Sequence, residues 1–190
     1  MATVNSYTWI MPTPERTSLD AIVLAASSLL EESGLAGVTM QAVAERVGVR
    51  APSLYKRVDG RERLIQLVAE AALTEVARRT EHASTVAELA DTLRTFGHER
   101  PAAFQLVMTP GTGTPVAGPG YGPAASAGLV RVARELAGER DGLDAARTLT
   151  AWATGFITME LNGSFQLGGD VDTAWRFGLD RLVTAMTASR

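Results

Sequence analysis

The stretch TMQAVAERVGVRAPSLYKRVDGRERL, residues 39–64, holds the two features from which the fold can be worked out. It carries six basic and three acidic side chains, whereas the whole 190-residue chain has a formal net charge of −3. Pro52 also stands between two segments that both have helical patterning. Proline is tolerated in the first turn of a helix but costs about 3 kcal/mol in its interior. Pro52 therefore predicts the start of a short helix over about residues 51–58.

The residues around Gly48 match a helix-turn-helix. Thr39 can cap a short helix that buries Val43, and a glycine in the turn lets the following helix cross it closely. An apolar stripe over residues 19–33, with Gly34 as its stop, predicts a longer helix in front of this pair. Once the apolar residues point inward, short polar and basic side chains remain outside at the start of the second helix. Such side chains can enter a DNA major groove, which is about 12 Å wide.

The rest of the chain also has helical patterning, with neither the alternation of a β-strand nor an internal repeat. The predicted fold class is therefore all-α, with about nine helices. Spacing typical of a capping box predicts helix starts at Asp59, with Glu62, and at Thr85, with Glu88. Further helices are predicted at 101–108, 124–137, 142–162 and 171–188. Residues 109–123 contain five glycines and four prolines, which predicts a long loop.

Composition excludes several kinds of site. The chain has no cysteine, so disulfides, thiolate metal sites and cysteine nucleophiles are excluded. His82 and His98 lack local metal-ligand partners beyond an adjacent glutamate, and the sequence contains no GxSxG, HExxH or complete P-loop motif. We therefore expect no catalytic residue, no metal, no cofactor and no enzymatic activity. No apolar run reaches the roughly 20 residues that span a bilayer, and residues 1–16 do not resemble a signal peptide, so we expect a cytoplasmic protein without a membrane partner.

Residues 37–65, GVTMQAVAERVGVRAPSLYKRVDGRERLI, resemble the DNA-binding domain of the tetracycline-repressor-like (TetR) family of bacterial transcriptional regulators. The residues that carry this resemblance are Thr39, Ala44, Gly48, Val49, Leu54, Tyr55 and Arg61. Residues 96–108 and 151–163 look like a ligand-domain subtype of the family marked by Trp, His and Gly, with Thr154 in the place of the histidine. The resemblance implies the following organisation: a flexible arm (1–16), a three-helix DNA-binding domain (17–62) and a helical ligand-binding and dimerisation domain (63–190).

The same resemblance assigns DNA contacts, and the chemistry of the side chains supports them. Hydroxyl, amide and guanidinium groups near helix starts suit phosphate, whereas an arginine at the start of the recognition helix suits the two acceptors of guanine. The predicted DNA-binding residues are Thr39, Gln41, Arg50, Ala51, Pro52, Ser53, Tyr55, Lys56, Arg57 and Arg61. The alternative is that this basic helix face is only solvated.

Large apolar side chains in the middle of the chain predict a cavity between the fifth, sixth and eighth predicted helices. The predicted ligand-binding residues are Phe96, Phe104, Met108, Trp152, Phe156 and Met159. Few charges lie among them, which favours a small apolar or neutral effector, with Thr154, His98 or Gln105 as a polar anchor. The alternative is that these side chains only pack in the core.

The last two predicted helices carry apolar residues on more than one face, which favours a homodimer built from them. The predicted interface residues are Ile157, Leu161, Trp175, Leu179, Leu182 and Val183.

The expected function is that of a ligand-responsive transcriptional regulator, a repressor that binds a palindromic operator in double-stranded DNA as a homodimer and is released by its effector. Two alternatives stay open from the sequence. One is a DNA-binding regulator without a small-molecule ligand. The other is a helical interaction protein, or an enzyme, in which the basic stretch is incidental.

Overall fold

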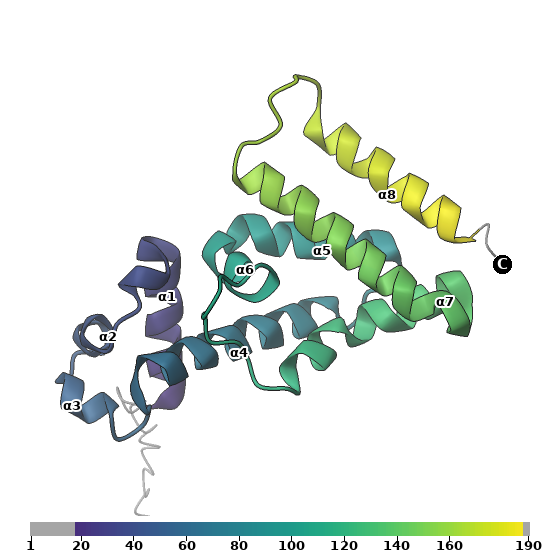
Figure 1. Ribbon diagram of the computed structural model, residues 1–190. Coiled ribbons are helices and arrows are strands. Elements are labelled where there is room, and N and C mark those ends of the chain that lie inside the picture. The colour runs from purple at the N-terminus through teal and green to yellow at the C-terminus, as the bar shows by residue number, and fades with distance from the viewer. Residues whose placement is uncertain (1–17, 188–190) are drawn as a thin grey trace, which may run out of the picture.

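The computed structural model describes residues 18–187, and every regular element among them is an α-helix (Figure 1). The all-α prediction is therefore confirmed. The helices are α1 (Leu19–Gly37), α2 (Met40–Val47), α3 (Ala51–Leu54), α4 (Gly60–Thr80), α5 (Val86–Glu99), α6 (Pro101–Met108), α7 (Tyr121–Leu161) and α8 (Val171–Thr187). The arm predicted for residues 1–16 lies outside the described residues.

Eight helices are present in the described part of the chain, where about nine were predicted, because two predicted helices are joined in α7. Gly138 interrupts α7 with a φ of 84° and a ψ of 165°, which is not helical. Only glycine adopts such a conformation without strain. The two runs on either side of Gly138 correspond to the predicted helices at 124–137 and 142–162. Gly34 interrupts the end of α1 in the same way, with a φ of 66°, and so agrees with its predicted role as a stop.

The predicted helix starts at residues 39 and 85 are capped as expected. The hydroxyl oxygen of Thr85 accepts a hydrogen bond from the backbone N–H of Glu88 at 3.1 Å. The Glu88 carboxylate in turn accepts from the backbone N–H of Ser84 at 2.7 Å, and this bond lowers the pKa of Glu88. The capping box predicted at Asp59 does not form, since that side chain makes no capping hydrogen bond. Asp59 has a ψ of 65°, far from the extended ψ of 156° at Thr85, so its carboxylate is not aimed at the helix start.

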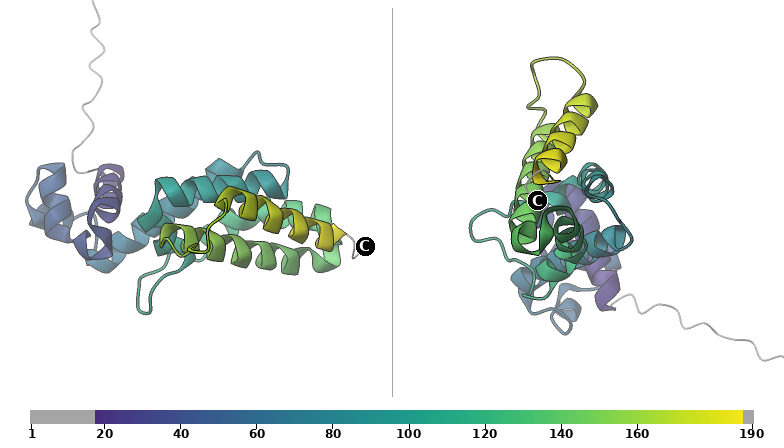
Figure 2. Two further views of the ribbon diagram at one scale, coloured as in Figure 1. Left: turned by 90° about the horizontal axis from the view of Figure 1, so that it is seen from above. Right: turned by 90° about the vertical axis from the view of Figure 1, so that its right-hand side faces the viewer.

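The molecule is elongated, with α1–α3 gathered at one end and the remaining helices forming the larger body (Figure 2). One apolar core nevertheless reaches from Ile22 in α1, which is 0% exposed, to Trp175 in α8, which is 1% exposed. The helix α4 extends from the α1–α3 end into the body, and the domain boundary predicted between residues 62 and 63 falls inside it. One continuous helix, α4, therefore belongs to both parts of the molecule.

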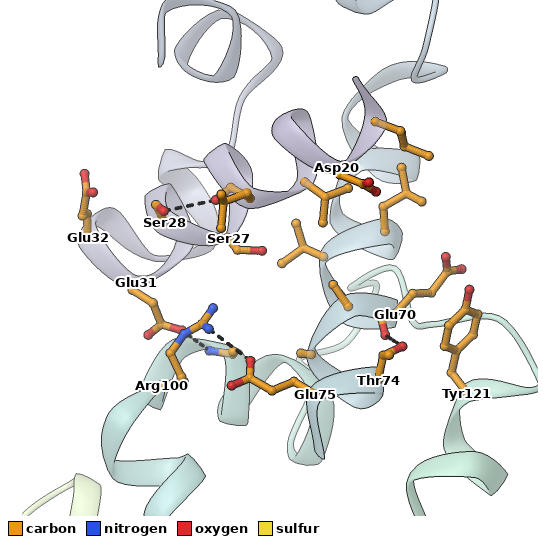
Figure 3. Close-up of a pocket in the computed structure, with 18 residues that line it drawn as sticks. Asp20, Ser27, Ser28, Glu31, Glu32, Glu70, Thr74, Glu75, Arg100 and Tyr121 are labelled. Carbon is orange, nitrogen blue, oxygen red and sulfur yellow. Dashed lines mark hydrogen bonds and ion pairs between the residues drawn. The ribbon is translucent and has the colours of Figure 1, made fainter. Parts of the chain in front are cut away.

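A polar junction joins α1 to the body where α6 begins (Figure 3). The Glu31 carboxylate accepts hydrogen bonds from the backbone N–H groups of Ala102 and Ala103, at 3.0 and 3.1 Å, and from Nε of Arg100 at 3.2 Å. Arg100 also pairs with Glu75 of α4 at 3.2 Å. Helix starts carry unpaired N–H groups and partial positive charge, so a carboxylate stabilises them. Glu31 thus caps α6 from a distant helix.

We expect Glu31→Ala to lower the free energy of unfolding by about 1–2 kcal/mol, because two N–H groups at the start of α6 and Arg100 lose their acceptor. Urea denaturation followed by circular dichroism measures the change. The control is Glu45→Ala, since Glu45 is exposed and accepts from exposed Gln41. Equal stabilities for the two variants would contradict a capping role for Glu31.

Candidate DNA interface and central cavity

The turn between α2 and α3 has the geometry that a helix-turn-helix requires. Gly48 takes a left-handed conformation with a φ of 75°, and the N–H of Val49 donates to the carbonyl of Ala44 at 2.9 Å. Leu54 and Val58 are 0% and 1% exposed, so they fix α3 and the turn after it against the core. The sequence therefore folds here into a short helix anchored on one side and open to solvent on the other.

The helix α3 begins where Pro52 predicted it, with the proline in its first turn. It is shorter than predicted, because regular helix ends at Leu54 and residues 55–57 form a turn. Tyr55 is 59% exposed, although it is a large aromatic residue. Arg50, at the N-cap of α3, is also exposed and makes no capping hydrogen bond.

The other predicted DNA-binding residues differ in how exposed they are and in whether their side chains already make a hydrogen bond. Pro52, Lys56 and Arg57 are exposed, whereas Ala51 and Ser53 are half-buried. Thr39 accepts a hydrogen bond from the N–H of Ala42 at 3.1 Å, which leaves its hydroxyl proton available for a phosphate. Gln41 is exposed and donates to Glu45 at 2.7 Å. The predicted residues thus lie at the start of α2 and in and around α3, and most of them are exposed.

Arg61 has a structural partner that the sequence did not reveal. Its Nε donates to the carbonyl of Val38 at 2.8 Å, and a terminal nitrogen donates to the carbonyl of Leu35 at 2.6 Å. The last carbonyls of a helix lack intrahelical donors, so a nearby arginine can satisfy them. Arg61 therefore ties the start of α4 to the end of α1, and it remains exposed beside this contact.

A cavity of about 260 Å³ lies in the body between α4, α5, α6, α7 and α8, and we call it the central cavity. Its wall has no charged side chain among the described residues. The hydroxyls of Thr80, Ser126 and Thr150 reach the wall, but each donates to a carbonyl of its own helix. Their donor capacity is thus already used, and the central cavity presents a largely apolar surface.

Two of the six predicted ligand-binding residues, Met108 and Trp152, line the central cavity. Phe96 and Phe104 do not, since they are 1% and 0% exposed and packed in the core. Phe156 packs against Trp152 with ring centroids 5.7 Å apart but does not line the wall, and Met159 is 44% exposed on the outside.

The rest of the wall consists mainly of aliphatic and small residues, which were not among the predicted ligand contacts. They include Leu73, Val76, Leu89, Ala90, Leu93, Ala125, Leu129, Leu149, Ala153 and Leu179. A run of small residues at the start of α7, residues 122–128, was the available signal, because small side chains leave space between packed helices. Among the predicted polar anchors, Thr154 has a buried hydroxyl oxygen with no hydrogen-bond partner in the described structure, yet it does not line the central cavity.

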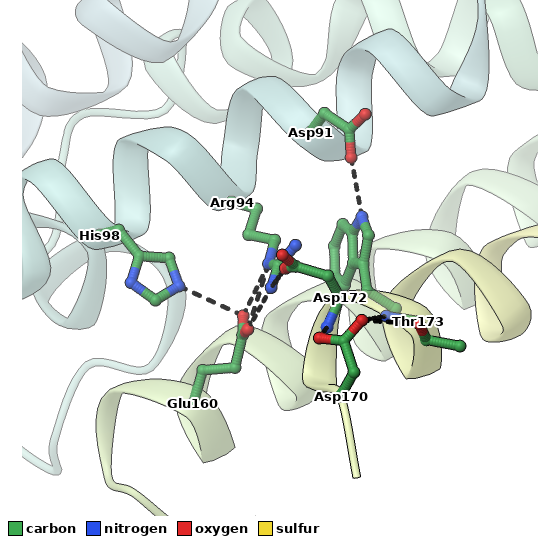
Figure 4. Close-up of polar contacts among 8 residues, drawn as sticks. Asp91, Arg94, His98, Glu160, Asp170, Asp172 and Thr173 are labelled. Atoms are coloured by element: carbon green, nitrogen blue, oxygen red, sulfur yellow. Dashed lines mark hydrogen bonds and ion pairs between the residues drawn. The ribbon is translucent and has the colours of Figure 1, made fainter.

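A polar cluster fastens α8 to α5 and α7 (Figure 4). Arg94 donates to Glu160 through two nitrogens, at 2.5 to 3.2 Å, and to Asp172 at 2.6 Å. The bond to Glu160 raises the pKa of Arg94, and its guanidinium lies 5.1 Å from the centre of the Trp175 ring. His98 approaches Glu160 to 3.3 Å. The cluster thus explains His98, which the sequence left without a partner.

Two family models match this chain and together cover most of its helices. The model for bacterial regulatory proteins of the tetR family matches residues 22–68, and the model for the tetracyclin repressor-like C-terminal domain matches residues 86–182. The chain belongs to the TetR family. It is therefore a transcriptional regulator of the DNA-binding, helix-turn-helix class. The Trp-His-Gly subtype stays a prediction, because neither match distinguishes it.

Curated transcriptional regulators resemble the chain to different extents. The class A tetracycline repressor of Escherichia coli from transposon 1721 is 35% identical over 77 residues, which are 40% of this chain and 33% of that protein. The match therefore spans about a third of that relative's length. An uncharacterised HTH-type transcriptional regulator of Mycobacterium tuberculosis is 26% identical over 175 residues, 84% of this chain and 76% of that protein.

Solved structures of bacterial regulators share the fold over most of the chain. The regulatory protein SCO4313 matches with a TM-score of 0.72 and 22% sequence identity, and the match covers 86% of this chain and 93% of SCO4313. A TetR variant from Acinetobacter baumannii AYE, solved in complex with minocycline, matches with a TM-score of 0.66 and 24% sequence identity. This match covers 91% of this chain and 98% of the variant. No helix in the described part of this TetR chain is both long and apolar enough to cross a membrane.

The dimer residues predicted for this TetR chain differ in exposure. Ile157, Trp175 and Leu179 are 0%, 1% and 7% exposed, so they pack inside the subunit and leave little surface for a partner. Leu161, Leu182 and Val183 are half-buried. The helix α8 packs so closely on α7 that a Cβ atom at Gly178 would come within 2.6 Å of the Trp152 ring.

Proposed function

We propose that this chain is a repressor that binds a palindromic operator as a homodimer and is released when a small, largely apolar effector occupies the central cavity. The observation that carries the DNA-binding part is the exposed surface formed by Arg50, Tyr55 and Lys56 at the two ends of α3, which Leu54 anchors in the core. An exposed arginine at the start of a recognition helix can donate two hydrogen bonds to guanine, while tyrosine and lysine reach phosphates. We assign those roles to Arg50, Tyr55 and Lys56.

Selection from a pool of random duplexes tests the operator part of this proposal. The wild-type protein should enrich a two-fold symmetric sequence whose half-sites lie about one helical turn, 34–36 Å, apart. Failure to enrich any sequence over bulk DNA at physiological salt would contradict operator binding.

We expect Arg50→Ala to weaken binding to the selected duplex by about 1–3 kcal/mol, or roughly 5- to 150-fold, because a bidentate contact to a base is lost. Fluorescence anisotropy with the labelled duplex measures the affinity. The matched control is Arg78→Ala, since Arg78 is also exposed but lies towards the far end of α4. When the selection is repeated with Arg50→Ala, the base pair that Arg50 contacts should also vary more among the selected duplexes. Equal losses for the two variants would instead indicate a non-specific effect of charge.

The dimer surface that we propose is the outer face of α7 and α8. On α8, Phe177 is 63% exposed, on the side away from buried Trp175. On α7, Met159 is 44% exposed, and space is open around Gly155, where an added Cβ would meet no atom within 4 Å. Exposed large apolar side chains next to an open glycine form a surface onto which another protein can pack. We propose that the same face of a second copy packs there, as in a two-fold symmetric dimer.

The central cavity supports an effector that is uncharged and mainly apolar. A buried charge requires a partner, and the wall offers no charged side chain among the described residues. The TetR protein of Acinetobacter baumannii, whose fold this chain shares, has been solved with minocycline, so proteins of this fold can hold a small molecule.

We assign the coupling between the two sites to α4. This helix lines the central cavity through Leu73, Val76 and Thr80, and it carries Arg61, which is bonded to the end of α1. A ligand that displaces α4 therefore also displaces α1–α3. In a dimer this changes the separation of the two recognition helices, and a separation that no longer matches one turn of DNA loses the second half-site. An effector that occupies the cavity without changing operator affinity would contradict this coupling.

A further inference from the structure

A second cavity of about 240 Å³ lies beneath the loop between α6 and α7, and we call it the loop compartment. Its roof is formed by residues 116–119 and Pro110, and its floor by Ala69 and Leu106. No charged side chain lines it within the described structure, so its polar surface comes from the backbone of the loop. The loop compartment therefore offers an apolar, uncharged space like that of the central cavity.

The two cavities share part of their walls. Leu73 of α4, Val107 of α6 and Gly122 of α7 line both of them. At Gly122 no Cβ stands between the two spaces, and an added Cβ there would meet no atom within 4 Å. The partition thus consists of two aliphatic side chains and an open glycine, which a change of rotamer can widen.

The volumes of the two cavities favour a single ligand site formed by both. Small-molecule sites in proteins generally enclose about 300–1,000 Å³. The central cavity, at about 260 Å³, and the loop compartment, at about 240 Å³, each fall below this range, whereas the two together fall within it. A ligand confined to one of them would be small for an effector site.

The loop has a contact that can open. The backbone N–H of Gly118 donates to Oε1 of Glu70 at 3.3 Å, which is long for an N–H···O bond. The same oxygen accepts from Arg63 at 3.0 Å, so Glu70 keeps a charged partner when the loop moves away. Glu70 is 7% exposed and would be costly to leave unpaired. Because Arg63 already provides that partner, lifting residues 116–118 costs little.

We propose that the effector site has two compartments, the central cavity and the loop compartment, and that it takes an elongated neutral ligand whose two apolar ends occupy one compartment each. This inference rests on the proposed function of the central cavity as the effector site. It assigns the Gly- and Pro-rich loop the role of covering one end of the ligand, which accounts for a segment that the DNA-binding function does not use.

Two neutral probes of different length test the inference in the full-length protein. Naphthalene has two fused rings and fits one compartment, whereas N-phenyl-1-naphthylamine carries a further phenyl ring that must reach the second. Equilibrium dialysis measures the binding of each probe to the wild type and to three variants. Ala117→Leu and Ala69→Leu narrow the loop compartment from the loop and from α4, and Ala125→Leu narrows the central cavity. Circular dichroism establishes that each variant is folded.

We expect Ala117→Leu and Ala69→Leu to weaken binding of N-phenyl-1-naphthylamine by about tenfold or more, the effect of losing the burial of one ring. Naphthalene binding should change less than about twofold in these two variants, and Ala125→Leu should weaken both probes. If the longer probe does not bind the wild type, or binds both loop-compartment variants as tightly, the two-compartment site is overturned. If Ala125→Leu leaves naphthalene binding unchanged, or if naphthalene does not bind the wild type, the proposed function of the central cavity as the effector site is contradicted.

Discussion

Phe177→Arg is expected to convert the proposed dimer to monomers and to weaken operator binding by about 100-fold or more, while each subunit stays folded. Phe177 projects from the outer face of α8 and is 63% exposed, with the Arg181 guanidinium 5.2 Å from its ring centre. In a two-fold interface a second Phe177 and Arg181 come from the partner. Two further arginines there would repel each other and leave charge desolvated. Without the dimer, each recognition helix binds its half-site alone.

Sedimentation equilibrium measures the dimer, and fluorescence anisotropy measures the operator affinity. The matched control is Leu24→Arg, because Leu24 is 69% exposed in α1 and lies neither on the outer face of α7 and α8 nor in the wall of either cavity. The control should remain dimeric and bind normally. A Phe177→Arg protein that stays dimeric at micromolar concentration would exclude this face as the interface.

Arg94→Leu is expected to lower the free energy of unfolding by about 3–5 kcal/mol, because it leaves the Glu160 carboxylate unpaired in the interior. The side chain of Glu160 is 7% exposed, and Arg94 donates to it through two nitrogens. Arg94 also covers the Trp175 ring and pairs with Asp172 at the start of α8. His98 is 48% exposed and a weaker partner, so it does not replace the arginine. The expected decrease in the free energy of unfolding is therefore large for a single substitution.

Urea denaturation monitored by tryptophan fluorescence and circular dichroism measures this loss. The double variant Arg94→Leu with Glu160→Leu should recover most of the stability, since no buried charge is then left without a partner. Arg140→Leu is the surface control, because Arg140 is 90% exposed and its ion pair with Asp141 is solvated. If the double variant is no more stable than Arg94→Leu alone, the destabilisation comes from lost packing around Trp175 rather than from the unpaired carboxylate.

The elements of the DNA-binding end could be predicted because their signals are local. Thr39 caps the helix that follows it, Gly48 takes the left-handed turn, and Pro52 begins α3, each through its own backbone geometry. Where a local signal failed, as at Asp59, the backbone conformation needed for the cap was set by the turn before α4. The spacing of Asp59 and Glu62 does not reveal that conformation.

The cavity wall and the outward side of α8 could not be predicted, because both depend on which side of each helix meets a neighbouring helix. Phe96 and Phe104 are large and apolar, but they fill the core, while the cavity opens where Ala90 and Ala125 leave space. Trp175 points inward and Phe177, two residues later, points outward. Both positions are aromatic, so hydrophobicity alone cannot tell the inner face of α8 from the outer one.

The sequence by itself determined the all-α class, the helix-turn-helix and the family, because helix periodicity, caps, glycine turns and the spacing of short motifs act within a few residues of each other. Only the tertiary structure decided that Glu31 caps α6, that Arg61 binds the end of α1 and that Arg94 neutralises a buried glutamate. It also decided which side chains surround the two cavities. These contacts join residues that are far apart in the chain, and their partners are chosen by how the helices pack.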